Sequence, residues 1–258
     1  MTSRPTRSEA GHEQQLRDQS LVVIGGSSGI GLETARLARA EGADVVLVAR
    51  DPDRLRSAAD EVAARSVSAF DATDVDRIER FFADLSGPID HILVTGPGPY
   101  YSTLADMDFA EARRDVDNRL LGTLAIARYG SARMRPPGTL LFIGGTGGRQ
   151  AAVGFSLISA LTAAVPAMVA SLAVELAPIR INVIAAGFVD TPLSASLLGD
   201  QLEARRQELR STLPIGRVIG PADIAALAVH LMTNTALTGA TFDIDGGQQL
   251  LANRAAAK

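Results

Sequence analysis

The stretch LVVIGGSSGIGLETARLARAEG, residues 21–42, joins an apolar run of strand length to a helical pattern through a glycine-rich turn. Similar apolar runs recur at residues 44–49, 67–70, 91–96, 139–145, 180–187 and 240–246. Helical patterns lie between them, at residues 31–41, 52–64, 75–85, 109–134, 155–176 and 221–232. Strands that alternate with helices predict βαβ units and a parallel sheet. Because the strand runs are almost continuously apolar, both sheet faces should be covered by helices.

The fold class predicted is therefore α/β, with one doubly wound and mostly parallel sheet of seven strands. The 258 residues, 47% of them hydrophobic, suffice for one such domain, which we assign to residues 20–258. Residues 1–19 are polar and without period, so we expect a flexible tail there. Ligands of such sheets bind beyond the carboxyl ends of the strands, where the strand order reverses.

Composition excludes several classes of function. The chain has no cysteine, which excludes disulfides and thiolate metal sites, and no His, Asp and Glu cluster has metal-ligand spacing. No run approaches the roughly 20 apolar residues of a membrane helix, and the first residues lack the apolar stretch of a signal peptide. A net charge of −4 disfavours a general nucleic-acid surface. We expect a cytoplasmic protein with a small-molecule substrate.

Lysine is nearly absent from the chain. Of 25 basic residues only one is lysine, the last residue Lys258, and the other 24 are arginines. A coding bias toward arginine and alanine explains this count better than a selected absence of lysine does. Under either explanation, chemistry that needs a lysine inside the fold is excluded.

The glycine-rich turn indicates a nucleotide site. Gly25, Gly29 and Gly31 let the backbone turn tightly and approach a pyrophosphate, while the following helix offers unpaired N–H groups to the anion. The position of the turn between a strand and a helix strengthens this interpretation.

These residues resemble the first turn of the short-chain dehydrogenase/reductase family, Thr-Gly-x-x-x-Gly-x-Gly, with Ile24 in place of the threonine. Residues 185–192, AAGFVDTP, are similar to the family's nicotinamide loop, and residues 245–247 match its Asp-Gly-Gly. The resemblance runs from about residue 21 to 250 and implies a Rossmann fold. It also implies a cofactor site, made by Gly25, Ser27, Ser28, Gly29, Ile30, Gly31, Asp71, Gly96, Gly187, Val189 and Thr191.

Charge at the end of the second strand predicts which cofactor binds. An NAD enzyme needs a carboxylate there for the ribose 2′-OH, whereas a 2′-phosphate needs a cation. This strand ends in Ala49 and Arg50, so we expect NADP(H), with Arg50 on the phosphate. The alternative is an Arg50 that pairs with Asp51 or Asp53.

The family's catalytic residues are replaced in this chain. Aligned on residues 171–176, SLAVEL, the chain has Gly145, Ile158 and Thr162 at the Ser, Tyr and Lys positions. The family's Asn becomes Arg119. No Tyr-x-x-x-Lys exists anywhere in the sequence, so the ordinary proton relay is lost whatever the register.

Four other residues are candidates for the missing chemistry. Tyr100 or Tyr101 could supply a phenolic acid, unless they only pack on substrate or a neighbouring loop. Arg119 could stabilise negative charge, although its high pKa makes it a poor proton donor; the alternative is a structural ion pair with Asp115 or Asp117. Thr146 is a possible hydrogen-bond donor.

Three functions remain open. The first is an NADP(H)-dependent oxidoreductase that transfers hydride to or from a small carbonyl or imine. The second is a non-redox, cyclase-like enzyme that keeps the nucleotide as a structural element, and the third is an inactive NADP(H)-binding protein. Residues 193–213 predict a mobile lid with an amphipathic helix. The alanine-rich helix at 155–176 should pack against a symmetry mate, and the family implies homodimers or homotetramers.

Overall fold

The computed structural model of the chain describes residues 14–255. Seven strands form one sheet in the order β3-β2-β1-β4-β5-β6-β7, and every neighbouring pair is parallel. The strands are β1 (Ser20–Ile24), β2 (Asp44–Ala49), β3 (Ser66–Ala69), β4 (Ile89–Thr95), β5 (Met134–Gly145), β6 (Arg180–Ala186) and β7 (Thr241–Ile244). The predicted doubly wound α/β sheet is confirmed. Strand order reverses between β1 and β4, which opens a crevice at their carboxyl ends.

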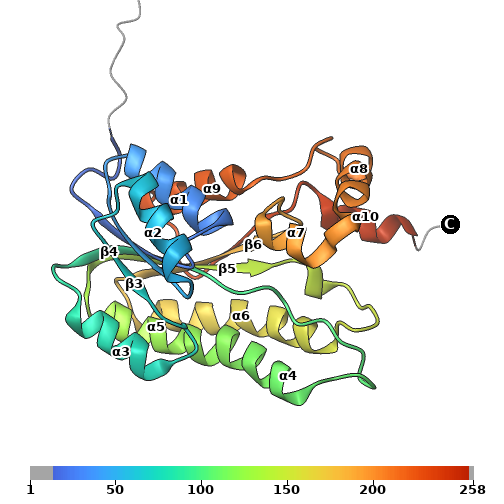
Figure 1. The fold of residues 1–258 in the computed structure, drawn as a ribbon, viewed down its shortest axis with the longest axis horizontal. Coiled ribbons are helices and arrows are strands. Elements are labelled where there is room, and N and C mark those ends of the chain that lie inside the picture. The colour runs from blue at the N-terminus through green and yellow to red at the C-terminus, as the bar shows by residue number, and fades with distance from the viewer. Residues whose placement is uncertain (1–13, 256–258) are drawn as a thin grey trace, which may run out of the picture.

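Helices cover both faces of the sheet (Figure 1). One layer holds α1 (Gly29–Ala40), α2 (Pro52–Val62) and α9 (Pro221–Thr233), and the other holds α3 (Val75–Asp84), α4 (Phe109–Val116), α5 (Gly122–Ser131) and α6 (Ser156–Glu175). Alternate residues of β1 serve the two cores: Val23 packs under α1, and Val22 packs on the opposite face. Three further helices, α7 (Pro192–Leu198), α8 (Leu202–Thr212) and α10 (Gln248–Ala255), lie beyond the carboxyl edge.

Two local predictions differ from the structure. Residues 14–19 are not a flexible tail, because Leu16 is completely buried and its N–H donates to the Glu41 carbonyl at 2.9 Å. A single apolar side chain among polar neighbours gave no periodic signal there; residues 1–13 of the predicted tail lie outside the described residues. The helix expected at 109–134 is divided into α4 and α5 by a π-helical turn, Asp117–Leu121.

Helix α6 is an unusually apolar element. Among the described helices it alone is long and apolar enough, by length and composition, to cross a membrane, contrary to the expectation that no run approaches that length. Val169 and Leu172 bury one of its faces in the core. Its exposed positions include a row of small side chains, Ala160, Ala163, Ala167 and Ala170. Packing of this row against a symmetry mate stays a prediction.

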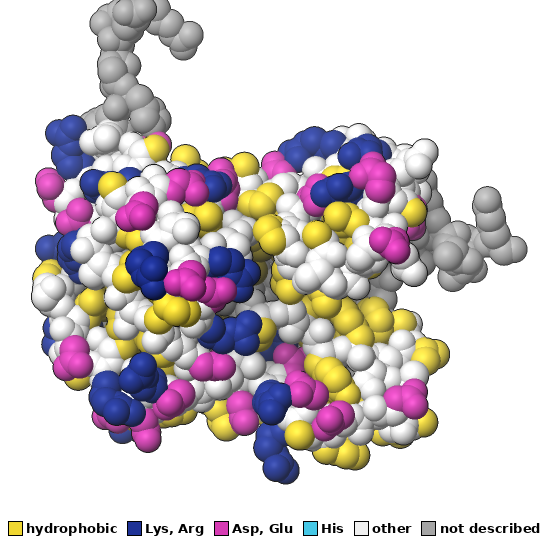
Figure 2. All heavy atoms as spheres, in the orientation of Figure 1, with side chains coloured by type: hydrophobic (Ala, Val, Ile, Leu, Met, Phe, Trp, Pro, Cys, Tyr) yellow, Lys and Arg dark blue, Asp and Glu magenta, His cyan; other side chains and the backbone are white. Residues whose placement is uncertain are grey.

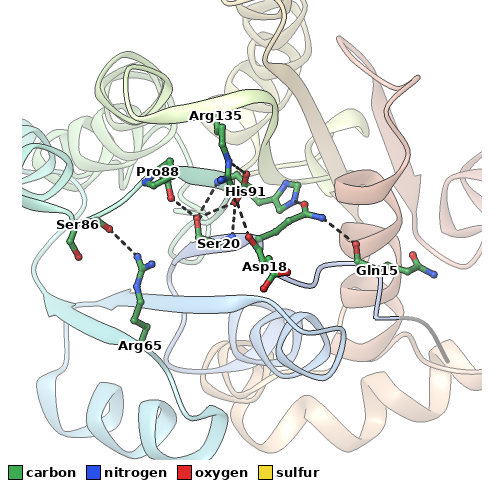
Figure 3. Close-up of polar contacts among 10 residues, drawn as sticks. Gln15, Asp18, Ser20, Arg65, Ser86, Pro88, His91 and Arg135 are labelled. Carbon is green, nitrogen blue, oxygen red and sulfur yellow. Dashed lines mark hydrogen bonds and ion pairs between the residues drawn. The ribbon is translucent and has the colours of Figure 1, made fainter. Parts of the chain in front are cut away.

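A polar cluster lies at the amino edge of the sheet, opposite the crevice (Figure 3). Asp90 accepts two N–H groups of Arg135, at 2.7 and 2.8 Å, and the Ser20 N–H at 2.8 Å. The adjacent His91 is 3% exposed; its Nε2 contacts Gln19 Oε1 at 2.7 Å, and its Nδ1 has no hydrogen-bond partner in the part of the chain that the structure describes. Burial lowers the pKa of His91 to about 4 from 6.5, with buried Arg180 contributing in the same direction and Asp90 opposing. His91 is therefore a neutral framework residue.

This burial predicts acid sensitivity of the fold. Below pH 6.5 the unfolded chain binds a proton at His91 that the folded chain accepts only near pH 4, so the free energy of unfolding falls over this window. Urea titrations should show a loss of about 2 kcal/mol between pH 7.5 and pH 5 that His91→Gln does not share. An equal loss in both proteins would place the acid sensitivity elsewhere.

Candidate functional site

A cleft of about 360 Å³ opens at the carboxyl ends of β1, β2, β3 and β4 and reaches the start of α7. Nine of the predicted cofactor residues line it: Gly25, Ser27, Ser28, Gly29, Ile30, Arg50, Asp71, Gly96 and Thr191. The sheet topology brings these residues together although they are spread over more than 160 positions of sequence. The cleft thus lies at the reversal of strand order, where the fold class predicts a ligand.

The glycine-rich turn is shaped by close backbone contacts. Gly25 has a φ of +86°, and a Cβ there would lie 2.7 Å from the Thr95 carbonyl oxygen. A Cβ on Gly31 would collide with the Gly25 carbonyl group, so this glycine serves helix packing and does not line the cleft. Gly29 has a φ of +55°, and a Cβ there would lie 3.6 Å from the Thr191 side chain, an ordinary van der Waals distance. The close contacts at Gly25 and Gly31 therefore allow the turn, whereas Gly29 is needed for its left-handed backbone conformation.

The amino terminus of α1 fits an anionic ligand. Its first turn contains no acidic residue, and the N-cap residue Ser28 makes no side-chain capping bond. The first N–H groups of the helix are therefore free to bind an anion, and the helix dipole favours negative charge there. A dinucleotide pyrophosphate matches this cradle of glycines and N–H groups.

Arg50 lines the cleft and has no partner among the described residues. Asp51 accepts from Arg54 at 2.9 Å, and Asp53 pairs with Arg56 at 2.9 Å. Within residues 14–255 the Arg50 side chain makes no hydrogen bond or ion pair, and it is exposed. The two acidic residues that could have neutralised Arg50 are thus taken by other arginines.

The remaining cofactor predictions fall in two groups. Asp71 lines the cleft and accepts both the N–H and the hydroxyl of Thr73 at 3.0 Å. Gly187 and Val189 lie outside the cleft lining, Gly187 against Asp245 and Val189 in a bridge with Ile219.

Several lining residues carried no signal in the sequence. Asn118 lines the cleft from the π-helical turn, while its neighbour Arg119 lines a different cavity. A regular helical pattern could not indicate this division, because the π turn changes the register. Arg54, Pro97, Leu193 and Ser196 also line the cleft.

Arg119 is held at the edge of the cleft by two contacts. Its Nε donates to Asp115 at 2.7 Å, and its Nη2 donates to the Pro97 carbonyl at 3.4 Å. Asp115 is only 4% exposed, so the predicted ion pair is present and nearly buried. The guanidinium also lines a cavity of about 20 Å³ with Gly144, Gly145, Thr162 and Arg149. No hydrogen bond to Arg119 Nη1 is present within residues 14–255.

The structure separates the other catalytic candidates. The Tyr100 hydroxyl accepts the Asp108 N–H at 2.8 Å, which anchors a loop. The Thr146 side chain is fully buried, and its hydroxyl donates to the Ala186 carbonyl at 3.4 Å. Tyr101 is 48% exposed and its ring packs on Phe155. Burial raises the pKa of Tyr101, opposed by Arg119 and reinforced by Asp115.

The positions aligned with the missing relay are apolar or small. Ile158 is buried in α6, 6% exposed, and lines neither cavity. Gly145 and Thr162 border the small cavity beside Arg119. None of these side chains offers a titratable group.

The predicted lid consists of two helices joined by a short turn. Leu193 and Leu197 of α7 face Gly98 in the loop after β4, and Leu193 lines the cleft. Arg206 of α8 donates two N–H groups to Asp190 at 2.8 and 2.9 Å. The lid is thereby tied to the loop that follows β6.

Comparisons with known proteins agree with this geometry. Residues 25–249 match a family model described as "Enoyl-(Acyl carrier protein) reductase". A cis-4-hydroxycyclohexanecarboxylate dehydrogenase from Sinomonas cyclohexanicum is 32% identical, over 91% of this chain and 98% of its own length. The chain belongs to the short-chain dehydrogenase/reductase family of oxidoreductases.

Two further likenesses concern ligands and reactions. The short-chain dehydrogenase/reductase malC of Malbranchea aurantiaca is 27% identical over 91% of this chain and 96% of its own length. Its solved structure, described as a reductase/Diels-Alderase, superposes with a TM-score of 0.85 at 25% identity, covering 92% and 99% of the two chains. A small-chain dehydrogenase solved with NADPH has a TM-score of 0.77 at 28% identity, with 90% and 99% covered.

The glycine contacts predict that an alanine substitution destabilises the fold at Gly31 but not at Gly96. Gly31→Ala should lower the free energy of unfolding by about 1 to 3 kcal/mol, because the new methyl group meets a backbone carbonyl that cannot move aside. Gly96→Ala is the matched control: nothing lies within 4 Å of its missing Cβ, and stability should change by less than about 0.5 kcal/mol. Urea unfolding measures both. Equal losses would show that the close approach at Gly31 does not constrain the turn.

Proposed function

We propose that this protein is an NADP(H)-dependent oxidoreductase that transfers hydride to or from a small organic carbonyl or imine without a tyrosine and lysine relay. The observation that carries the proposal is the cleft lined by nine predicted cofactor residues, with the Arg119 guanidinium anchored on Asp115 and on the carbonyl of Pro97, which lines that cleft. When bound, the nicotinamide supplies or accepts the hydride. A screen of ketones, imines and enones for NADPH oxidation tests the proposal, and no turnover of any acceptor would contradict it.

NADP(H) is favoured over NAD(H) by the charge at the mouth of the cleft. Arg50 is exposed there and pairs with no group in residues 14–255, and no carboxylate follows β2 until Asp51, which pairs with Arg54. A 2′-phosphate gains a charge-assisted contact with Arg50 that a 2′-hydroxyl lacks. The NADPH-bound relative supports this preference by analogy.

Arg119 would act on the charge that develops at the substrate. Addition of hydride to a carbonyl carbon breaks the C=O π bond and leaves a negative oxygen. Arg119 Nη1 can donate to that oxygen, with Asp115 and the Pro97 carbonyl keeping the guanidinium in place. The proton then comes from water, since the guanidinium keeps its own.

An imine acceptor makes a smaller demand on the protein. A protonated imine already carries its proton, and addition of hydride gives a neutral amine directly. The Arg119 and Asp115 pair has no net charge, so it does not exclude such a cation. The absence of a titratable group at Ile158 and Thr162 is then no obstacle.

A second candidate function is ring formation without redox change, with the nucleotide as a structural element. The specific observation in its favour is the likeness to malC, whose structure is described as a reductase/Diels-Alderase. A product of the same mass as its substrate, formed without NADPH oxidation, would favour this candidate over hydride transfer.

Cofactor preference is testable at Arg50. Arg50→Ala should raise the Kd of NADPH by about 10- to 100-fold, the value of a charge-assisted hydrogen bond, and leave the Kd of NADH unchanged. Arg56→Ala, which removes an exposed arginine paired with Asp53, should change neither constant. Calorimetric titration gives all values. Parallel losses for both nucleotides after Arg50→Ala would rule out the 2′-phosphate contact.

The role of Arg119 is testable by comparing two acceptors. Arg119→Gln should reduce kcat for a ketone by about 100-fold, because an oxyanion donor is lost, and reduce kcat for a preformed iminium by less than about tenfold. Arg113→Gln, at an exposed arginine of α4, should leave both rates unchanged. If Tyr101→Phe stops ketone turnover while Arg119→Gln does not, the phenol is the acid and this role of Arg119 is wrong.

A further inference from the structure

The loops that follow β4 and β5 are joined beside the cleft. The Ser102 N–H donates to the Gly154 carbonyl at 3.2 Å, and Gly154, with a φ of +82°, packs its backbone on Ser102. The neighbours of these two residues are also in contact, Tyr101 before Ser102 and Phe155 after Gly154. Their ring centroids lie 4.9 Å apart, with 33° between the ring planes. Two elements far apart in sequence thus build one aromatic surface, which we call the aromatic platform.

The platform borders the groups assigned above to the reaction. The Tyr100 N–H donates to Asp115 at 3.4 Å, so the peptide that leads into Tyr101 rests on the carboxylate that holds Arg119. Phe155 immediately precedes α6 and its carbonyl accepts the Ser159 N–H at 2.8 Å. The platform therefore connects the loop that contacts Asp115 of α4 with the start of α6, and α6 lines the small cavity of Arg119.

The platform keeps a free ring face and a free hydroxyl. Tyr101 is 48% exposed despite its contact with Phe155. Its hydroxyl makes no hydrogen bond within residues 14–255, whereas the hydroxyl of the adjacent Tyr100 is engaged by the Asp108 N–H. Aromatic side chains left half exposed at a site edge offer a flat, apolar face to which another ring can stack.

Several charges at this edge of the sheet are paired. Asp115 pairs with Arg119, Asp190 with Arg206 of the lid, and Arg149 with Asp243. The hydrophobic side chains exposed near these elements come from the loops after β4 and β5 and from α7, and Figure 2 shows hydrophobic side chains over the loops below α7 and α8. They include Leu104, Val153, Leu193 and Leu197. On the loop of Tyr101, Asp106 and Asp108 form no ion pair among the described residues but accept hydrogen bonds from Thr103 and from the first turn of α4. An apolar ring would find a stacking surface at Tyr101 and Phe155.

We propose that Tyr101 and Phe155 bind a flat, conjugated ring system of the substrate, and that the substrate class is aryl or polycyclic ketones and imines without a charged ring. This inference rests on the proposed hydride transfer for its reaction, but not for its binding site. Tyr101 serves here as a binding residue whose ring, not its hydroxyl, does the recognition.

The absence of tryptophan from the chain makes binding directly measurable. The fluorescence anisotropy of 2-naphthol, excited beyond the tyrosine band, reports its binding to the full-length protein with and without saturating NADP⁺. Tyr101→Leu and Phe155→Leu should each weaken 2-naphthol binding by about 10-fold or more, because ring area and ring contact are both lost. Tyr101→Phe keeps the ring and should bind as the wild type does.

The matched control is Phe109→Leu, the same change at an aromatic residue that is 72% exposed and has no ring partner among the described residues. It should leave 2-naphthol binding unchanged. Wild-type protein should also bind the saturated analogue 2-decalol at least tenfold more weakly, a comparison that needs no variant to fold. Equal affinity for the two compounds, or equal losses at Phe109 and Tyr101, would overturn the platform.

The two proposals can fail separately. If Tyr101→Leu reduces 2-acetonaphthone with an unchanged KM, the proposed ring binding by the platform is wrong, whereas the proposed hydride transfer is not contradicted. If 2-naphthol binding depends on Tyr101 and Phe155 but no acceptor oxidises NADPH, the proposed hydride transfer is wrong, whereas the ring binding is not contradicted.

Discussion

The parallel pairing of β1 with both β2 and β4 determines where this protein can bind a ligand. The strands that follow β1 are added first on one side of it, as β2 and β3, and then on its other side, as β4 to β7. The helices that follow β1 and β4 therefore lie on opposite faces of the sheet, and a crevice opens between the ends of these two strands. Thr95 at the end of β4 reaches across this crevice, and its hydroxyl donates to the carbonyls of Ile24 and Gly25 at 3.2 Å. The glycine turn, the cleft and the start of α1 all follow from this pairing.

Two arginines at the carboxyl edge of the sheet, Arg50 and Arg119, have different environments. Arg50 is exposed, and its acidic neighbours Asp51 and Asp53 pair with other arginines, so its positive charge is available to an anionic ligand. Arg119 is nearly buried and is aligned by Asp115 and a backbone carbonyl. A guanidinium held in this way can stabilise a developing charge but does not release a proton at ordinary pH. The proposed chemistry therefore relies on electrostatic stabilisation by Arg119, whereas the usual members of the family rely on proton transfer by a tyrosine and lysine relay.

The sequence predicted seven strands and helices on both faces of the sheet because most of the strands are apolar almost without interruption, and this signal is local. It also predicted nine of the residues that line the cleft, since the glycine turn and Arg50 lie at fixed offsets from β1 and β2. It could not predict the π turn that directs Asn118 into the cleft and Arg119 into another cavity, because both registers read equally well as helix. Leu16 was missed for a similar reason: one buried side chain has no period.

The sequence alone therefore determined the α/β class, the absence of any internal lysine and the glycines that a dinucleotide requires. Only the tertiary structure decided which candidates stand together. It showed that Asp51 and Asp53 pair away from Arg50, that the hydroxyl groups of Tyr100 and Thr146 are engaged, and that Tyr101 stacks on Phe155. Ion pairing and ring stacking can join residues that are distant in sequence. The partner of a charge or a ring therefore depends on how the loops pack, and a local sequence pattern does not predict that packing.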